Sequence, residues 1–375
     1  MQKTSYTKTM ETTVPFTRQQ RITNTLLLNS SFTENIGLMH GKMGIAIYFF
    51  HLARENKNKI YEDYAGELID EIYEEISIKT SLDFENGLAG IGWGIEYLVQ
   101  QGFLHADTDE VLEPIENQLQ SSRNQFEGIG LLNGITGLGE YYLKRLQNPH
   151  SSDEKATTHF SRQMLVLIID DLELLLSNDE IIELLNSPET FDLTWDYPVL
   201  IAFLAEVYQL DVFNFQVNKI LKLLIDPFFQ SEDLPKLHSN RLFLALAFEK
   251  LKHCKFEESL GTSIEGLIKR LNAIINREVI TDELALNSAF LINGTSGIAW
   301  VYKQLFCLTD DARYQKELIY WSGKSFEFED TNTGFAGFNI SEEKKETAFG
   351  LLEGLAGIAL ISVNTKILNS LHKQL

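Results

Sequence analysis

The chain has 375 residues, of which 44% are hydrophobic and 23% charged, a composition typical of a soluble globular protein with a large core. Its 32 basic and 53 acidic residues give a net charge of -21, which argues against nucleic acid as a partner because phosphates require a basic surface. No apolar stretch approaches the roughly 18 residues of a membrane span. Residues 1–24 form a polar, Thr-rich segment without the apolar core of a secretion signal. We therefore expect a cytoplasmic protein that does not associate with membranes.

A short glycine motif recurs through residues 25–375, each time before an apolar stretch. Each copy has His, Asn or Glu, followed by Gly-x-x-Gly and then Ile or Leu. The five copies begin at His40, Asn86, Asn133, Asn293 and Glu353. Self-similarity of this kind is the sequence signature of a repeat architecture, so we expect residues 25–375 to form a single repeat domain.

The spacing of the copies predicts the number of repeats. The first glycines of the first three copies are 46 and 47 residues apart, and those of the last two are 60 apart. The gap from Gly134 to Gly294 is 160 residues, or about three periods. Two further copies that have lost their glycines fit this gap, at Asp196 and at Asn240, and each precedes an apolar stretch. The count is then seven.

Each repeat is long enough for two helices. The stretch after each motif is apolar with helical periodicity, and a second amphipathic helix is predicted behind it, at residues 61–80 in the first repeat and 160–176 in the third. Residues 325–343, which contain Gly334 and Gly337, read as a long loop before the last repeat. Strand signals are sparse, so the predicted fold class is all-α.

The motif is suited to the start of a helix. The Asn or His lies near the N-cap, where a side-chain oxygen can accept a free N–H. The first glycine permits close approach of neighbouring backbone, and the second lets the helix pack tightly against its neighbour. Pairs of a tight inner helix and a bulkier outer one curve the array. Closure predicts an α/α toroid of about seven inner and seven outer helices.

Closure also predicts a binding site. The inner helices run the same way, so their N-termini and positive dipole ends gather around one mouth. The residues expected to form this binding rim are His40, Asn86, Asn133, Asp196, Asn240, Asn293 and Glu353. The candidate acid or base groups at the mouth are His40, Asp196, His238 and Glu353.

The ordered copies of His/Asn-Gly-x-x-Gly-Ile/Leu resemble those of the lanthionine synthetase C-like proteins, over nearly the whole chain from about Thr25. The resemblance implies a toroid of seven inner and seven outer helices. It also implies a reaction, in which a cysteine thiol of a ribosomally made precursor peptide is joined to a dehydrated Ser or Thr. In that reaction a zinc ion activates the thiol.

The zinc site that the resemblance implies has a Cys in the fifth repeat and a Cys-His pair opening the sixth, ligands that suit zinc. In this chain the fifth-repeat position falls on His238, and the pair is replaced by Ile292 and Asn293. The catalytic His of the family's fourth repeat falls near Trp195 and Asp196, so it is also absent.

Two cysteines, Cys254 and Cys307, lie too far along their helices to replace the missing ligands. They form neither a disulfide framework nor a Cys-x-x-Cys metal pair. We therefore expect neither zinc nor another cofactor, and no zinc-dependent cyclase activity.

Three functions remain open. The first is a lanthionine synthetase C-like protein of peptide modification, which binds a precursor peptide or a maturation enzyme at its rim; its acidic surface suits a basic partner. The second is a metal-free enzyme of the same fold. The third is a carbohydrate-active α/α barrel with paired carboxylates, Asp83 with Glu85 or Asp192 with Asp196. Six hairpins would favour the third function, and a count of seven argues against it.

Overall fold

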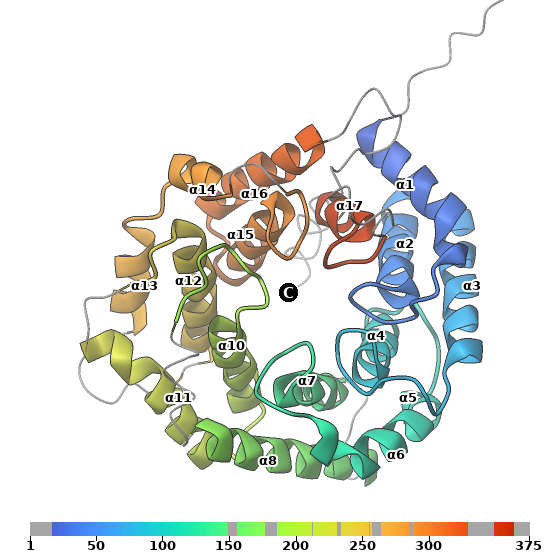
Figure 1. The fold of residues 1–375 in the computed structure, drawn as a ribbon, viewed down its shortest axis with the longest axis horizontal. Helices are drawn as coiled ribbons and strands as arrows, with labels where there is room; N and C mark the ends of the chain where they lie inside the picture. The colour runs from blue at the N-terminus through green and yellow to red at the C-terminus, as the bar shows by residue number, and fades with distance from the viewer. Residues whose placement is uncertain are drawn as a thin grey trace, which may run out of the picture.

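The computed structural model describes residues 17–148, 156–176, 186–211, 213–230, 234–254, 256, 264–284, 288–328 and 349–363. These residues are helices and connecting loops, with no strand among them. Figure 1 looks down the axis of two concentric rings of helices, which confirms the predicted α/α toroid. Among the described helices, none combines the length and apolarity that crossing a membrane would need.

The inner ring follows the seven predicted repeats, and each inner helix packs against the next. Its helices are α2 (Lys42–Asn56), α4 (Leu88–Gln100), α7 (Ile135–Leu146), α10 (Asp196–Gln209), α12 (His238–His253), α15 (Thr295–Thr309) and α17 (Leu355–Val363). The contact of α17 with α2 closes the circle. The two repeats without glycines, α10 and α12, are therefore present where the spacing placed them.

The outer ring covers the inner one and buries its apolar side chains in a continuous core. Its helices are α1 (Arg18–Asn29), α3 (Lys59–Glu75), α5 (Thr108–Val111) with α6 (Glu113–Ser121), α8 (Ala156–Leu176), α11 (Asn214–Gln230), α13 (Ile264–Asn272) with α14 (Arg277–Glu283), and α16 (Ala312–Ser325). Helices α3 and α8 correspond to the stretches predicted at 61–80 and 160–176, although α3 ends earlier than expected.

Helix α1 supplies the outer partner of α17, so the two ends of the described chain meet in the ring (Figure 1). Thr17 caps α1 through a capping box with Gln20, and Ile22 and Leu26 are buried. The helix therefore crosses the boundary that we expected at residue 24. Polar composition concealed it because only a narrow apolar stripe faces the core.

One buried charge joins the two rings in the second and third repeats. Arg145 on α7 donates hydrogen bonds to Glu96 on α4 at 2.7 Å and to Glu116 on α6 at 2.8 Å. All three side chains are less than 10% exposed, and Asp109 also contacts the guanidinium. A guanidinium with several donors satisfies carboxylates that would be costly to bury alone.

The predicted loop at 325–343 lies mostly outside the described residues. Within the described part, Ser325 ends α16 and Phe326–Phe328 form a 3-10 turn. The first residues of that stretch are therefore helical.

Candidate functional site

The first glycine of each motif is the N-cap of its helix, and the preceding Asn or His lies one position before it. At Gly41, Gly87, Gly134 and Gly294 no side chain caps the helix, so the expected capping by Asn or His is not found. The backbone at these glycines is extended with negative φ, which any residue can adopt. Close approach is what requires glycine: a Cβ on Gly87 would lie 2.4 Å from the carbonyl oxygen of Ser81.

The second glycine is needed for the same reason, one turn further on. The loop before each inner helix crosses that helix, and a Cβ on Gly90 would lie 2.1 Å from the carbonyl oxygen of Phe84. A side chain from the loop of another repeat also approaches: the Cβ of Phe84 lies 2.7 Å from a Cβ on Gly137. The close contact is thus with loop backbone six residues upstream and not mainly with the neighbouring helix, as we had expected.

These loops join into a collar around the mouth of the ring. In each link a backbone N–H of one repeat donates to an oxygen of a later one, and the seventh repeat returns to the first. The links are Met39 to Glu85 (2.8 Å), Phe84 to Leu132 (2.9 Å), Leu193 to Ile292 (2.7 Å), Ile292 to Leu352 (3.0 Å) and Leu351 to Met39 (2.8 Å).

A side chain provides the remaining link. The carboxylate of Asp196 accepts the backbone N–H of Leu131, which connects the third repeat to the fourth. Burial raises the pKa of Asp196, and the charge of Asp192 raises it further, while this hydrogen bond lowers it. Asp196 therefore serves to hold the collar together, in addition to its place at the mouth.

Three side chains meet at the mouth, from the first three repeats. His40 Nε2 lies 2.8 Å from Glu85 Oε1, and both side chains are about one quarter exposed. The other oxygen of Glu85 accepts a longer hydrogen bond, 3.4 Å, from Asn133 Nδ2. A carboxylate that holds one imidazole nitrogen fixes the orientation of the ring, as in general-base sites.

Other predicted rim residues lie at the mouth with different roles. Asn86 accepts a hydrogen bond from Asn35 at 2.7 Å and supports the loop of the first repeat. Asn293 is exposed, and Glu353 is half-buried. The side chains of Asn293 and Glu353 make no hydrogen bond within the described residues, so both are available to a ligand.

Asn240 does not belong to the accessible rim. It is fully buried, and its Nδ2 donates to the carbonyl of Pro188 at 2.9 Å. The loop that precedes α10 passes over the N-terminus of α12 to reach the sixth repeat, and so covers Asn240. The sequence could not show this crossing because it depends on a long-range contact.

His238 also lies away from the pair formed by His40 and Glu85. Its Nδ1 accepts the backbone N–H of Asn276, the N-cap of α14 in the outer ring, at 3.1 Å. The carboxylate of Glu283 accepts the N–H groups of His238 and Ser239 and so caps α12. One ring nitrogen of His238 is therefore engaged in joining the two rings.

The zinc ligands implied by the resemblance do not fit here. Ile292 has no donor atom, and the exposed amide of Asn293 is a poor ligand compared with thiolate or imidazole. In the described residues, no group of three or more His, Cys, Asp or Glu side chains is arranged to hold a metal ion. Burial raises the pKa of both Cys254 and Cys307, which disfavours the thiolate that binds metal.

The proposed carboxylate pairs are used locally. Asp83 accepts the N–H of Asn86 at 2.7 Å, and Asp192 accepts both the N–H and the hydroxyl of Thr194. Glu85 forms its pair with His40, and not with Asp83. Together with seven inner helices in the described chain, this argues against the carbohydrate-active barrel.

The pairing of His40 with Glu85 was missed in the sequence. A signal was present: the residue before the Asn, His or Glu is apolar in four of the five copies, whereas in the second copy it is Glu85.

The close approach of the loops at Gly37 and Gly350 was also not identified from the sequence. A Cβ at these positions would lie 2.2 Å from Asn86 Cα and 2.4 Å from His40 Cα, respectively.

Comparison with known proteins agrees with this geometry. Residues 33–187, which span the first three repeats, match the family model described as "Lanthionine synthetase C-like protein". Over these residues the chain is therefore similar to the lanthionine synthetase C-like family, as the motif indicated. No curated protein matches the sequence.

The ring as a whole is similar to a solved structure named "Nisin cyclase". The TM-score is 0.67 at 14% sequence identity, and the match covers 92% of this chain and 94% of that one. At this identity the likeness establishes the fold of the chain and not its reaction.

Proposed function

We propose that the chain is a lanthionine synthetase C-like protein that acts in the cytoplasm in the modification of ribosomally made peptides. Its mouth binds a precursor peptide or a maturation enzyme, without zinc-dependent cyclisation. The observation that carries the proposal is the cluster of His40, Glu85 and Asn133, which is accessible where the inner helices begin. A concave mouth with a few convergent polar groups is a natural binding site.

The residues at the family's zinc positions support the second part of the proposal. Activation of a thiol by zinc requires several sulfur or nitrogen ligands and an open position for the substrate. Ile292 and Asn293 cannot supply two of these ligands, and His238 has one nitrogen engaged by Asn276. Binding therefore depends on the side chains of the mouth itself.

Charge supports a basic partner. The net charge of -21 attracts a positively charged peptide and speeds its encounter with the mouth. This attraction is screened by salt, so the association rate should fall as ionic strength rises.

The pair formed by His40 and Glu85 favours a second candidate function, a metal-free enzyme. Glu85 holds one ring nitrogen of His40 at 2.8 Å, which is the arrangement of an oriented general base. If the protein is such an enzyme, His40→Ala abolishes turnover of a bound peptide. If His40 only binds the peptide, His40→Ala lowers the affinity for the peptide and no turnover is seen in either protein.

The test is binding of a synthetic precursor peptide encoded beside the gene, measured by fluorescence polarisation. His40→Ala and Glu85→Gln should weaken binding about tenfold, because each removes part of a polar anchor worth about 1.4 kcal/mol. The matched control is His105→Ala, an exposed histidine in the loop after α4. Equal affinity of all four proteins would refute a binding role for the mouth. Mass spectrometry of the recovered peptide separates binding from turnover.

A further inference from the structure

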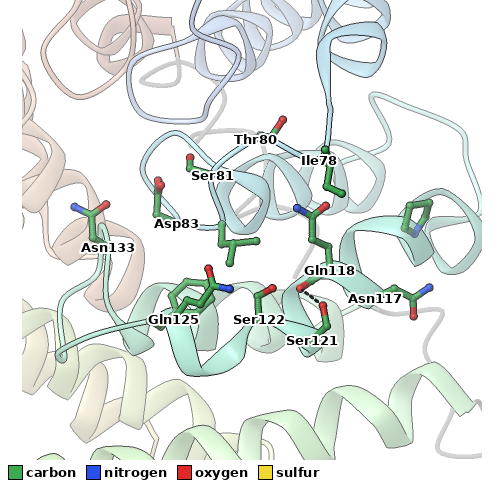
Figure 2. A pocket seen from close by; sticks show the side chains of 13 residues that line it. Ile78, Thr80, Ser81, Asp83, Asn117, Gln118, Ser121, Ser122, Gln125 and Asn133 are labelled. Carbon is green, nitrogen blue, oxygen red and sulfur yellow. Dashed lines mark hydrogen bonds between the residues drawn. The ribbon is translucent and has the colours of Figure 1, made fainter.

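A polar groove opens beside the mouth, between the two rings of the second repeat. The loop at 76–87 forms one wall, and α6 with the following 3-10 turn at Arg123–Gln125 forms the other (Figure 2). Its volume is about 850 Å³, within the size range of sites for small ligands and peptide segments. Of the rim residues predicted from the sequence, Asn133 is the one that lines this groove.

Amide and hydroxyl side chains dominate the lining. Gln118, Ser122 and Gln125 face the groove from the outer wall. Their side chains make no hydrogen bond to other residues in the described chain, so their donors and acceptors are available to a ligand. An amide side chain can donate and accept at once, which matches the alternating N–H and C=O groups of an extended peptide backbone.

The charge of the lining selects against acidic ligands. Of the groove-lining side chains in the part of the chain that is described, only Asp83 is charged, and no Lys or Arg is present. One oxygen of Asp83 accepts the N–H of Asn86, and the carboxylate keeps its negative field. A ligand carboxylate or phosphate would therefore meet repulsion without a compensating cation.

Apolar contacts are available at the outer end. Ile78 is 90% exposed, and Pro114 and Phe126 line the same groove. A large exposed aliphatic side chain beside an amide-rich wall provides a contact for an apolar side chain of a bound peptide.

The inner end of the groove is continuous with the mouth. Asn133 lines the groove and also donates to Glu85, which pairs with His40. In Figure 2 Asn133 and Asp83 lie at one end of the groove, whereas Ile78 and Asn117 lie toward the other. A chain held in the groove would thus lead from the outer edge of the ring to the imidazole of His40.

We infer that this groove binds an extended, uncharged polar stretch of the peptide substrate and directs it toward the mouth. The inference rests on the proposed function, since it assigns a path to the same peptide. Amide side chains supply backbone hydrogen bonds, Ile78 contacts an apolar side chain, and Asp83 disfavours acidic sequences.

The experiment uses the full chain and a matched pair of substitutions at the end of α6. Ser121 is exposed and lines the groove, whereas Gln120 is exposed and does not. Ser121→Trp fills the groove, and Gln120→Trp adds the same ring beside it. The probe is a fluorescein-labelled dodecapeptide of Ser, Thr, Asn and Gly, compared with one in which each Ser is replaced by Glu.

We expect Ser121→Trp to weaken binding of the neutral peptide about tenfold and Gln120→Trp to leave it unchanged. The acidic peptide should bind more weakly than the neutral one. Hydrogen exchange should show peptide-dependent protection at 76–87 and 113–126, which persists in His40→Ala.

Three results would overturn the inference. If the peptide protects only the mouth and the two Trp variants bind equally, the groove is not the path, while the proposed function stands. If maltohexaose protects the groove and the peptide does not, the site takes a neutral sugar. If no peptide binds and His40→Ala has no effect, both the inference and the proposed function fail.

Discussion

Replacing Gly90 by Ala should destabilise the ring, although the same substitution stabilises an ordinary exposed helix. Gly90 is the second glycine of the second motif, in the first turn of α4. An added Cβ would lie 2.1 Å from the carbonyl oxygen of Phe84, and the Cβ of Leu38 closes the other side at 3.1 Å. The helix and the loop therefore cannot both keep their positions.

The magnitude follows from the contacts. The Phe84 carbonyl must retreat by about 0.9 Å, from 2.1 Å to 3.0 Å, yet the N–H of Phe84 is bonded to Leu132 at 2.9 Å in the collar. Overpacking costs about 1–3 kcal/mol, and a strained collar hydrogen bond adds about 1 kcal/mol. Alanine returns about 1 kcal/mol through helix propensity. The net loss is about 1–3 kcal/mol.

Urea unfolding followed by circular dichroism measures this difference. The matched control is Gly66→Ala in α3, where an added Cβ meets nothing within 4 Å. The control should gain about 1 kcal/mol in the free energy of unfolding. A Gly90→Ala variant as stable as the wild type, or more so, would refute the argument that the motif glycines are required by the crossing loop.

Three other predictions concern charges and metal. Arg145→Met leaves Glu96 and Glu116 buried without their cation, so the free energy of unfolding should fall by about 3–5 kcal/mol. Lys59→Met, at an exposed ion pair with Asp63, should leave the free energy of unfolding nearly unchanged, and equal losses in the two variants would contradict the assignment. Burial, reinforced by the charge of a neighbouring carboxylate, raises the pKa of Glu140 to about 8. The stability that this proton contributes is complete below the ordinary pKa of 4.5 and is lost as pH rises through about 8. Glu140→Gln should therefore match the wild type in urea near pH 4.5 and exceed it near pH 8, and a constant difference would count against the assignment. Finally, metal analysis of protein purified with added zinc should find well under one ion per chain, and a stoichiometric ion would overturn the reading of the mouth as zinc-free.

The repeats differ in how much of them could be predicted. Five copies carry both glycines because a loop crosses each of their helices and leaves no room for a Cβ. The glycines therefore mark these repeats in the sequence. At α10 and α12 the apolar pattern alone located the helices. There the loop of the fourth repeat passes over α12 and buries Asn240, and no local pattern encodes that path.

The mouth of the ring could also be predicted only in part from the sequence. The sequence predicted that the inner helices begin around one mouth, because helices of equal direction and regular spacing place their N-termini together, but it also placed Asn240 there, which is buried. The resemblance of its motifs implied that Ile292 and Asn293 stand at the family's zinc positions. Only the tertiary structure decided that His40 pairs with Glu85, that His238 is held by Asn276 of the outer ring, and that Asp196 completes the collar. Periodicity within one helix defines its buried face, whereas these partners lie tens of residues apart and meet only when the ring closes.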